Sequence, residues 1–564
     1  MNLTQIKGTE KPAAPKYWRS LAERTGTSDV IARLEGEFGS QVEELSPASR
    51  RQIMKLMAAS FGMAGMVACR RPEEKILPVS KAVEDIVPGK PTFYASAITV
   101  RGVANGVQVE VHDGRPTKIE GNPMHPASQG AASAFVQASV LSLYDPDRAR
   151  KVEHAGGPVE WAAFDKECAD HCSKMGIGTG FRILSERTTS PTLLGLKAAL
   201  LKKYPSAKWV EYDAIDAGHG LAAAEMVFGE RLQAHYHFDK ADVILSLDDD
   251  FLSLDAASTL PLKHYSRKRK VSNPGDAMNR LYVVESQFSV TGGMADHRLR
   301  MRTAEVGQFA SDLAVELGAS QALKVLKSGD ATQKWIAAVA RDLKAHAGKC
   351  VVTAGVKQPA AVHAIAYQIN QALGNIGTTV TFTKPVYEAS TPLAEFATEL
   401  SQGRVTTLLI LGGNPAFTAP VDLNFVEGIR KVGNSYYLGL ESDETAALCK
   451  WHLPMAHELE TWGDARSLDG TASIQQPMVR PIWSGRSAIE IVAQFASEDH
   501  KPKKGYEVVR AQWKDLDEKA WRKALHDGVV AGTAFAEAKV TLNAKAVPTI
   551  TASPADGYEV VFLE

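Results

Sequence analysis

Strand-length apolar runs alternate with helical segments through much of this 564-residue chain, and this alternation constrains its fold more than any other feature. Residues 241–247 form an apolar run flanked by charge, and residues 406–411 form another that opens into a GGNP loop. Runs of this kind suit parallel strands that are buried on both faces. Helical patterns lie between such runs at 161–172, 190–203 and 360–373. The pattern predicts an α/β fold in which helices cover the sheets.

The length indicates several domains, because one hydrophobic core rarely serves more than about 250–300 residues. The first α/β layer is expected to hold the strand runs near 180–185, 208–212, 241–247 and 281–285, and the second those near 350–355 and 406–411. We therefore predict two Rossmann-like layers behind a small β-rich domain. The predicted divisions are an extension at 1–48, a leader at 49–69, the β-rich domain at 70–155, the two layers at 156–303 and 304–480, and a C-terminal segment at 481–564.

Composition excludes several classes of protein. The formal net charge is −1, which argues against a nucleic-acid partner because such proteins present a basic face. The five cysteines are few and scattered, so a disulfide-stapled scaffold is not expected. The chain also has no uncharged apolar run of the roughly 18 residues that a transmembrane helix needs.

A leader-like segment begins well inside the chain. Arg50 and Arg51 form a twin-arginine pattern, the mostly apolar run 56–68 follows, and Cys69 ends it in a lipobox-like context. This combination is typical of a twin-arginine export signal with a cysteine that accepts lipid. The alternative is a buried amphipathic helix, since Ile53 and Leu56 have near-helical spacing. The export interpretation is favoured because all three parts occur together.

The stretch 102–148 combines a strand pattern with rigid turns. The alternation at 107–111 ends in Asp113-Gly114, a turn pair, and a GNPMHP loop and a YDPDR segment follow. This order resembles the opening of the molybdopterin oxidoreductase family. In catalytic members the region carries four cysteines for an iron–sulfur cluster, and thiolates are the ligands that such a cluster needs. No cysteine lies between Arg70 and Glu167, and Ser133 stands where the last cluster cysteine usually falls.

The resemblance extends over residues 15–495. The runs 243–250, 354–359 and 408–420 resemble the nucleotide-side strands and loops of the family. The displaced leader, the YWRSLAE element at 17–23 and the run 286–298 resemble the molybdopterin-like B subunit of alternative complex III, a bacterial quinol-oxidising respiratory complex. What the resemblance implies is a subunit on the periplasmic face of the cytoplasmic membrane, exported by the twin-arginine route.

Departures from the family decide the expected function. The cluster cysteines are absent, and no residue is recognised as a molybdenum ligand. Full-length B subunits continue into a ferredoxin-like region beyond the turn and apolar strand expected at 556–564, where Val561 and Phe562 would form an exposed edge. We therefore expect no catalytic residue, no metal site and no cofactor in this chain. The expected partners are a multihaem cytochrome, polytopic quinol-binding membrane subunits and a ferredoxin-like iron–sulfur protein.

Two other functions remain open. One is an active molybdenum bis-pterin oxidoreductase of the polysulfide- or nitrate-reductase type. The other is a periplasmic lipoprotein that binds a nucleotide-like ligand in the cleft of the fold. Gly412, Gly413, Asn414 and Pro415 could cradle a phosphate, because glycine permits close backbone approach, but a tight turn is the favoured interpretation.

Four further clusters are each expected to be structural. Cys168 and Cys172 share a helix face beside His171, and free cysteines are usually buried. Histidines readily find hydrogen-bond partners, so we expect the histidines of two further clusters to be hydrogen-bonded or at the surface and not metal ligands. The aspartates 248–250 are expected to form a solvated strand end. The histidine-containing clusters are His235 with His237, and His452 and His457 with Glu458 and Glu460.

Overall fold

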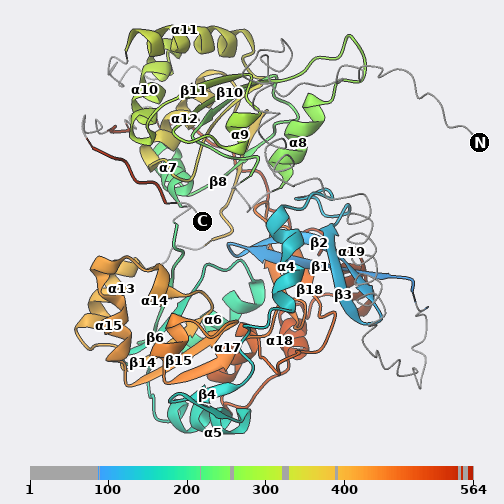
Figure 1. Cartoon of the computed structure of the whole chain (residues 1–564), viewed down its shortest axis with the longest axis vertical. Helices are drawn as coiled ribbons and strands as arrows, with labels where there is room; N and C mark the ends of the chain where they lie inside the picture. Colours follow the sequence, from blue (N-terminus) through green and yellow to red (C-terminus); the bar gives the residue numbers. More distant parts are fainter. Residues whose placement is uncertain are drawn as a thin grey trace, which may run out of the picture. The chain divides into compact units, whose positions relative to one another are not determined.

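The computed structural model describes residues 87, 89–215, 218–253, 259–319, 329–387, 391–543, 548–550 and 557–562 (Figure 1). These residues belong to one compact unit that spans residues 85–564. The predicted extension and the leader, with Arg50, Arg51 and Cys69, lie outside the described residues. Among the residues that are described, no helix is long and apolar enough to cross a membrane.

An antiparallel three-stranded sheet opens the described chain. It consists of β1 (Thr92–Val100), β2 (Val103–His112) and β3 (Arg115–Gly121), in that order. Asp113 and Gly114 turn the chain between β2 and β3 with positive φ angles of 49° and 79°, as the sequence pattern predicts. Helix α4 (Ala134–Leu143) packs on this sheet, and the Ser133 hydroxyl caps it by accepting a hydrogen bond from Val136 N. Ser133 therefore serves as a helix cap in this chain.

A four-stranded parallel sheet forms one α/β layer, with the strand order β11-β10-β9-β12. Residues of β9 and β12 are buried throughout. The strands are β9 (Val243–Leu247), β10 (Arg280–Glu285), β11 (His297–Arg300) and β12 (Cys350–Ala354). A separate antiparallel pair joins β8 (Gln233–Tyr236) to β13 (Val380–Thr383). The helices in this part of the chain are α7 (His219–Phe228), α8 (Leu260–Arg269), α9 (Val290–Gly293), η1 (Thr303–Glu305), α10 (Val306–Leu317), α11 (Asp330–Ala345) and α12 (Ala360–Ala372).

A seven-stranded sheet forms the second layer, with the order β5-β4-β16-β15-β14-β6-β7. Its five strands from β16 to β7 are parallel, whereas β4 and β5 run antiparallel at one edge. The strands are β4 (Val152–His154), β5 (Gly157–Val159), β6 (Phe181–Ser185), β7 (Lys208–Glu211), β14 (Thr407–Leu411), β15 (Asn434–Gly439) and β16 (Trp451–Pro454).

Helices and a hairpin complete this second part of the molecule. The hairpin pairs β17 (Gly463–Arg466) with β18 (Ala472–Gln475). The helices are α5 (Trp161–Cys172), α6 (Pro191–Lys203), α13 (Leu393–Ser401), α14 (Pro415–Thr418), η2 (Val421–Leu423), α15 (Phe425–Arg430), α16 (Glu444–Leu448), α17 (Ala488–Ala496), α18 (Gly505–Gln512) and α19 (Glu518–Asp527). Apolar side chains of α5, α6, α17 and α19 are buried against the sheet in one large core.

The predicted grouping of strands into layers is wrong, although the strands themselves are present. Strands β6 and β7 pair with β14 and its neighbours, and β12 pairs with β9. The layers therefore interleave along the chain and do not follow the division at 303/304. An apolar pattern shows that a strand is buried but carries no information about which strand lies beside it.

The C-terminal expectation is also corrected. Residues 557–562 contain no strand. The Glu559 carboxylate accepts a hydrogen bond from Ala304 N at 2.7 Å, which fastens the segment to η1. Val560 and Phe562 are exposed, whereas Val561 is half-buried.

Candidate functional site

Each parallel sheet has one point at which the strand order reverses direction. In the seven-stranded sheet the chain runs from β6 outward to β7 and returns to the other side of β6 as β14. In the four-stranded sheet it runs from β9 through β10 to β11 and returns to the other side of β9 as β12. Open α/β sheets bind ligands in the crevice beyond the carboxyl ends of the strands at such a switch point. The β6/β14 and β9/β12 switch points are therefore the two candidate sites.

The β6/β14 switch point opens into a cavity of about 700 Å³. Its wall comes from the β1–β2 turn, the carboxyl ends of β6, β7 and β14, and the segment around β17. The predicted loop of Gly412, Gly413, Asn414 and Pro415 lies in this wall, directly after β14. Both glycines have positive φ angles, of 73° and 66°, which other residues adopt only with strain.

Contacts from behind hold this loop in a tight turn. The Tyr437 hydroxyl donates to the Gly413 carbonyl at 2.8 Å, and the Asn414 side-chain amide donates to Glu444 at 2.6 Å. On the cavity side, Glu186 from the end of β6 lies against the two glycines. A Cβ atom added at Gly412 would be 3.1 Å from Glu186 Oε2, and one at Gly413 would be 3.1 Å from Glu186 Cγ. The turn therefore has a carboxylate beside it.

Two further carboxyl groups in the cavity wall are committed to internal contacts. Glu458 accepts hydrogen bonds from Thr99 N and Gln475 Nε2, at 3.0 Å each. Asp464 accepts from the Thr192 hydroxyl at 2.6 Å and from the Trp513 indole at 2.7 Å. Burial raises the pKa of both carboxyls, although these hydrogen bonds oppose the rise. Their partners join β1, β18, α6 and the segment after α18, so these groups tie the elements of the wall together.

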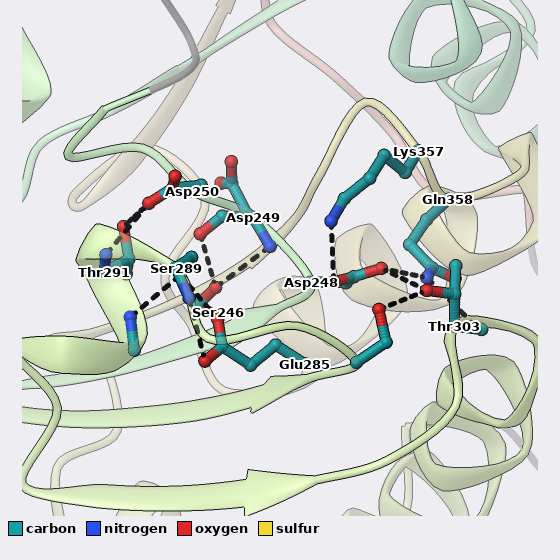
Figure 2. A network of polar contacts seen from close by, with 12 residues as sticks. Ser246, Asp248, Asp249, Asp250, Glu285, Ser289, Thr291, Thr303, Lys357 and Gln358 are labelled. Carbon is teal, nitrogen blue, oxygen red and sulfur yellow. Dashed lines mark hydrogen bonds and ion pairs between the residues drawn. The ribbon is translucent and has the colours of Figure 1, made fainter. Parts of the chain in front are cut away.

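The β9/β12 switch point is closed by an ion pair (Figure 2). Asp248, directly after β9, lies 3.1 Å from the Lys357 ammonium, which follows β12. Gln358 Nε2 donates to Asp248 at 3.0 Å, and the Thr303 hydroxyl donates to it at 3.1 Å. The side chains of Asp248 and Lys357 are 1% and 8% exposed. The prediction of a solvated strand end is therefore wrong for Asp248, because the long-range contact with Lys357 removes it from water.

The neighbouring aspartates have separate partners. Asp249 accepts from the Thr353 hydroxyl at 2.6 Å, and Asp250 accepts from the Thr291 hydroxyl at 2.7 Å (Figure 2). Threonines on β12 and α9 thus bind the second and third aspartates. The three carboxylates diverge toward different elements and do not converge on one point.

Gly355 permits this closure, and its replacement should disrupt it. A Cβ atom at Gly355 would lie 2.0 Å from the Asp248 carbonyl oxygen. We expect Gly355→Ala to destabilise the four-stranded layer by about 3 kcal/mol, at the upper end for overpacking, because backbone must move on both sides. Urea unfolding of the variant measures the loss. Gly275→Ala is the control, because no atom lies within 4 Å of a Cβ there; equal midpoints for the two variants would contradict the prediction.

The cysteines are confirmed as buried structural residues where the sequence predicts this. Cys168 and Cys172 lie on one face of α5 with their sulfur atoms 3.8 Å apart, and both are buried. His171 bonds instead to the Thr407 hydroxyl at 3.0 Å. Burial raises the pKa of Cys350 to about 11 and that of Cys449 to about 12, so neither is a ready thiolate. Within the described ranges, no three His, Cys, Asp or Glu side chains are placed to hold a metal ion.

The predicted hydrogen bonds are found for His235, His237 and His457, whereas His452 is buried and neither of its ring nitrogens has a hydrogen-bond partner. His235 on β8 and His237 just after it bond to the hydroxyls of Thr383 and Thr381, at 2.9 and 3.0 Å. His457 bonds to the Ser142 hydroxyl at 2.9 Å. The predicted polar cluster around His452 and His457 is divided. His452 stacks on Tyr437, Glu458 lines the cavity, and Glu460 binds Arg148.

The sequence did not single out two basic residues that form buried ion pairs, Arg148 and Lys357. Arg148 ends the YDPDR segment that was noted only as a motif, and Lys357 follows the glycine after β12. A lone cation after one parallel strand and an aspartate after another is the signal that could have paired Lys357 with Asp248. Arg148 offered no such signal, because it lies between α4 and β4 and does not follow a parallel strand.

Acid should destabilise the protein through buried neutral histidines. Burial and the nearby Arg148 charge lower the pKa of His457 to about 4, and burial lowers those of His235 and His363 to about 4. The pKa of histidine in the unfolded chain is about 6.5. The stability that these neutral histidines contribute is therefore fully present above that pH and is lost as the pH falls toward 4. We expect His457→Asn, which cannot titrate, to remove about 3 kcal/mol of this dependence. Urea unfolding across that range checks it, and parallel curves for wild type and variant would contradict it.

Comparisons with known proteins bear on the fold. No family model matches the chain. The chain is 22% identical over 479 residues to the menaquinone reductase, molybdopterin-binding-like subunit, of Nitratidesulfovibrio vulgaris, and the match covers 76% of this chain and 68% of that protein. Among solved structures it is similar to acetylene hydratase from Pelobacter acetylenicus, with a TM-score of 0.55, 14% identity, and coverage of 76% of this chain and 74% of that one. The predicted fold class, a multi-domain α/β fold like that of the molybdopterin oxidoreductases, is thereby confirmed.

Proposed function

We propose that this chain, which has a molybdopterin-oxidoreductase-like fold, is a non-catalytic structural subunit of a quinol:acceptor oxidoreductase of the alternative complex III type. The relative from N. vulgaris is named as a molybdopterin-binding-like subunit of a menaquinone reductase, which supports a place in quinone-linked electron transfer. The chain would act at the periplasmic face of the cytoplasmic membrane. Arg50 and Arg51 would direct its export, and Cys69 would accept lipid.

The observation that carries the non-catalytic role is the closed β9/β12 switch point. A bis-pterin enzyme of this fold needs a nucleotide crevice on each layer, and a nucleotide brings phosphate charge. Here the Asp248–Lys357 ion pair and the Gln358 amide join the loop after β9 to the loop after β12. These two loops would have to separate to admit a nucleotide. Opening this site would break the buried ion pair and the hydrogen bond from Gln358. The residues present at this switch point therefore do not fit a dinucleotide.

The β6/β14 switch point has room, but the Glu186 side chain occupies the space beside the glycine turn. Glu186 lies against Gly412 and Gly413, where a phosphate would have to accept hydrogen bonds from the turn. The cysteines of the described chain also lie away from the cavity wall, so no thiolate is available there as a molybdenum ligand. The role left to the chain is to hold its partners together through buried surface.

Purification from native membranes tests this proposal. The tagged full chain is extracted in mild detergent, and its co-purifying proteins are identified by mass spectrometry. We expect a multihaem cytochrome, polytopic quinol-binding subunits and a ferredoxin-like iron–sulfur protein, with quinol oxidation in the same fraction. A chain that elutes alone, from membranes in which the other subunits are present, would contradict the proposal.

The open cavity favours one second candidate, a lipoprotein that binds a small ligand. Its volume of about 700 Å³ lies within the range of roughly 300–1,000 Å³ that ligand sites occupy. This candidate predicts a monomer that retains a small molecule through purification. Mass spectrometry of the denatured monomer fraction would reveal that molecule, whereas the structural-subunit proposal predicts none.

A further inference from the structure

Helix α8 carries the densest positive charge in the described chain. Lys263, Arg267, Lys268, Arg269 and Lys270 all lie within residues 259–271, and that segment contains no acidic residue. The whole chain has a net charge of −1, so this run is a local feature. Basic surface helices of this kind attract anionic surfaces.

The cations of α8 are not all engaged by acidic partners. Lys268 pairs with Asp242 at 2.9 Å, and Arg269 pairs with Asp296 at 2.8 Å. Arg267 instead donates to the neutral side-chain oxygen of Gln129 at 3.0 Å, so its charge is not neutralised there. Arg267 and Lys270 are both exposed. These two residues are therefore placed to meet negative charge from outside the protein.

Exposed apolar side chains lie on two of the segments that α8 contacts. On one side, the Tyr265 hydroxyl donates to the carbonyl of Met294, just after α9 (Figure 1). Met294 is 50% exposed, and Phe288, just before α9, is 75% exposed. On the other side, α8 bonds to residues 129–131, which lead into α4. Helix α4 contains no charged residue, and Leu141 on its outer face is 70% exposed.

The outer side of α4 presents large apolar side chains to solvent beside the polar Gln137. Val136, Val140 and Leu143 are buried against the sheet, while Phe135 and Leu141 face outward. Large apolar side chains that are exposed together on a surface often mark a site of interaction. An occupant is therefore expected on its outer face.

We propose that the α4, α8 and α9 surface docks on an anionic lipid membrane, with Arg267 and Lys270 at the headgroups and Phe135, Leu141, Phe288 and Met294 entering the interface. Charge complementarity selects the occupant, because cations beside exposed apolar and aromatic side chains match a negatively charged bilayer surface. This inference goes beyond the proposed function and does not depend on it.

Partitioning onto lipid vesicles tests the proposal with the full chain. Vesicles of phosphatidylglycerol with phosphatidylcholine are compared with vesicles of phosphatidylcholine alone. Arg267→Gln with Lys270→Gln should weaken binding to the anionic vesicles roughly thirtyfold at low salt, and less at high salt. Residues 1–86 are present in every variant, so their own affinity for lipid cancels in the ratio.

Matched variants elsewhere on the chain provide the controls. Arg404→Gln with Lys431→Gln removes the same charge from exposed positions on the other layer and should leave binding unchanged. Phe288→Ser with Met294→Ser should weaken binding, whereas Phe417→Ser with Val421→Ser, at positions 73% and 92% exposed, should not. Circular dichroism confirms that each variant is folded. Equal binding to both kinds of vesicle, or equal losses in the test and control variants, would overturn the proposal and assign the surface to a protein partner.

Discussion

Replacing Glu460 with alanine should destabilise the protein by about 4 kcal/mol, because it leaves the Arg148 guanidinium buried without its counter-ion. The two side chains are 0% and 1% exposed, and their closest atoms are 2.6 Å apart. Glu460 also accepts hydrogen bonds from His457 N at 2.9 Å and Ile482 N at 2.8 Å. The loss therefore loosens the junction of three segments that are distant in sequence. Urea unfolding followed by tryptophan fluorescence measures it.

An exposed pair supplies the control. Glu427 and Arg430 are 62% and 58% exposed, so Glu427→Ala should change stability by less than about 1 kcal/mol. A Glu460→Ala variant that loses no more than this control would contradict the prediction.

The Arg148–Glu460 pair is a second source of acid sensitivity. Burial opposes ionisation of Glu460, but hydrogen bonds from Arg148 and from the backbone of Ile482 and His457 outweigh it and hold its pKa below the usual value. The pair's contribution is therefore present above the unfolded pKa of about 4.3 and is lost as the pH falls through the lower folded pKa. This loss begins at the lower end of the pH range in which His457 acts.

Replacing Lys357 with methionine should destabilise the four-stranded layer by about 3 kcal/mol, because Asp248 then remains buried without its cation. Gln358 and Thr303 still donate to Asp248, which keeps the loss at the lower end of the range. Adding Asp248→Asn to Lys357→Met should recover much of this loss. Asparagine tolerates the φ of 56° at this position, and its side-chain oxygen can accept the same two hydrogen bonds.

Local hydrogen exchange is the sharpest measurement for this pair, because it reports the stability of each layer separately. Amides of β9 and β12 should exchange faster in Lys357→Met and recover in the double variant. Amides of β6 and β14 in the other layer serve as the internal control. If the double variant is as unstable as the sum of the two single variants, the pair is not coupled as described.

The sequence predicted local structure well because local structure depends on nearby residues. The buried runs at β9 and β14, the Asp113-Gly114 turn and the GGNP loop at a strand end all follow from spacing and from backbone preference. The fold class followed from their order and from the family resemblance.

The sequence did not predict which strands pair or which polar groups meet. Strand β14 lies beside β6. Most of the four-stranded layer lies between these two strands in the sequence, and nothing in either apolar run specifies the other as its neighbour. Asp248 carries the same signal as Asp249 and Asp250, yet it alone reaches Lys357. Such contacts depend on the crossover connections, and side-chain type does not encode them.

Metal and pterin analysis of the chain purified from its own membranes tests the central claim most directly. The account predicts no molybdenum and no pterin fluorophore in the chain after it is separated from its partners. It attributes this to the Asp248–Lys357 pair at one switch point and to Glu186 at the other. Molybdenum near one atom per chain, with pterin released on denaturation, would contradict the account and make the protein an active molybdenum enzyme.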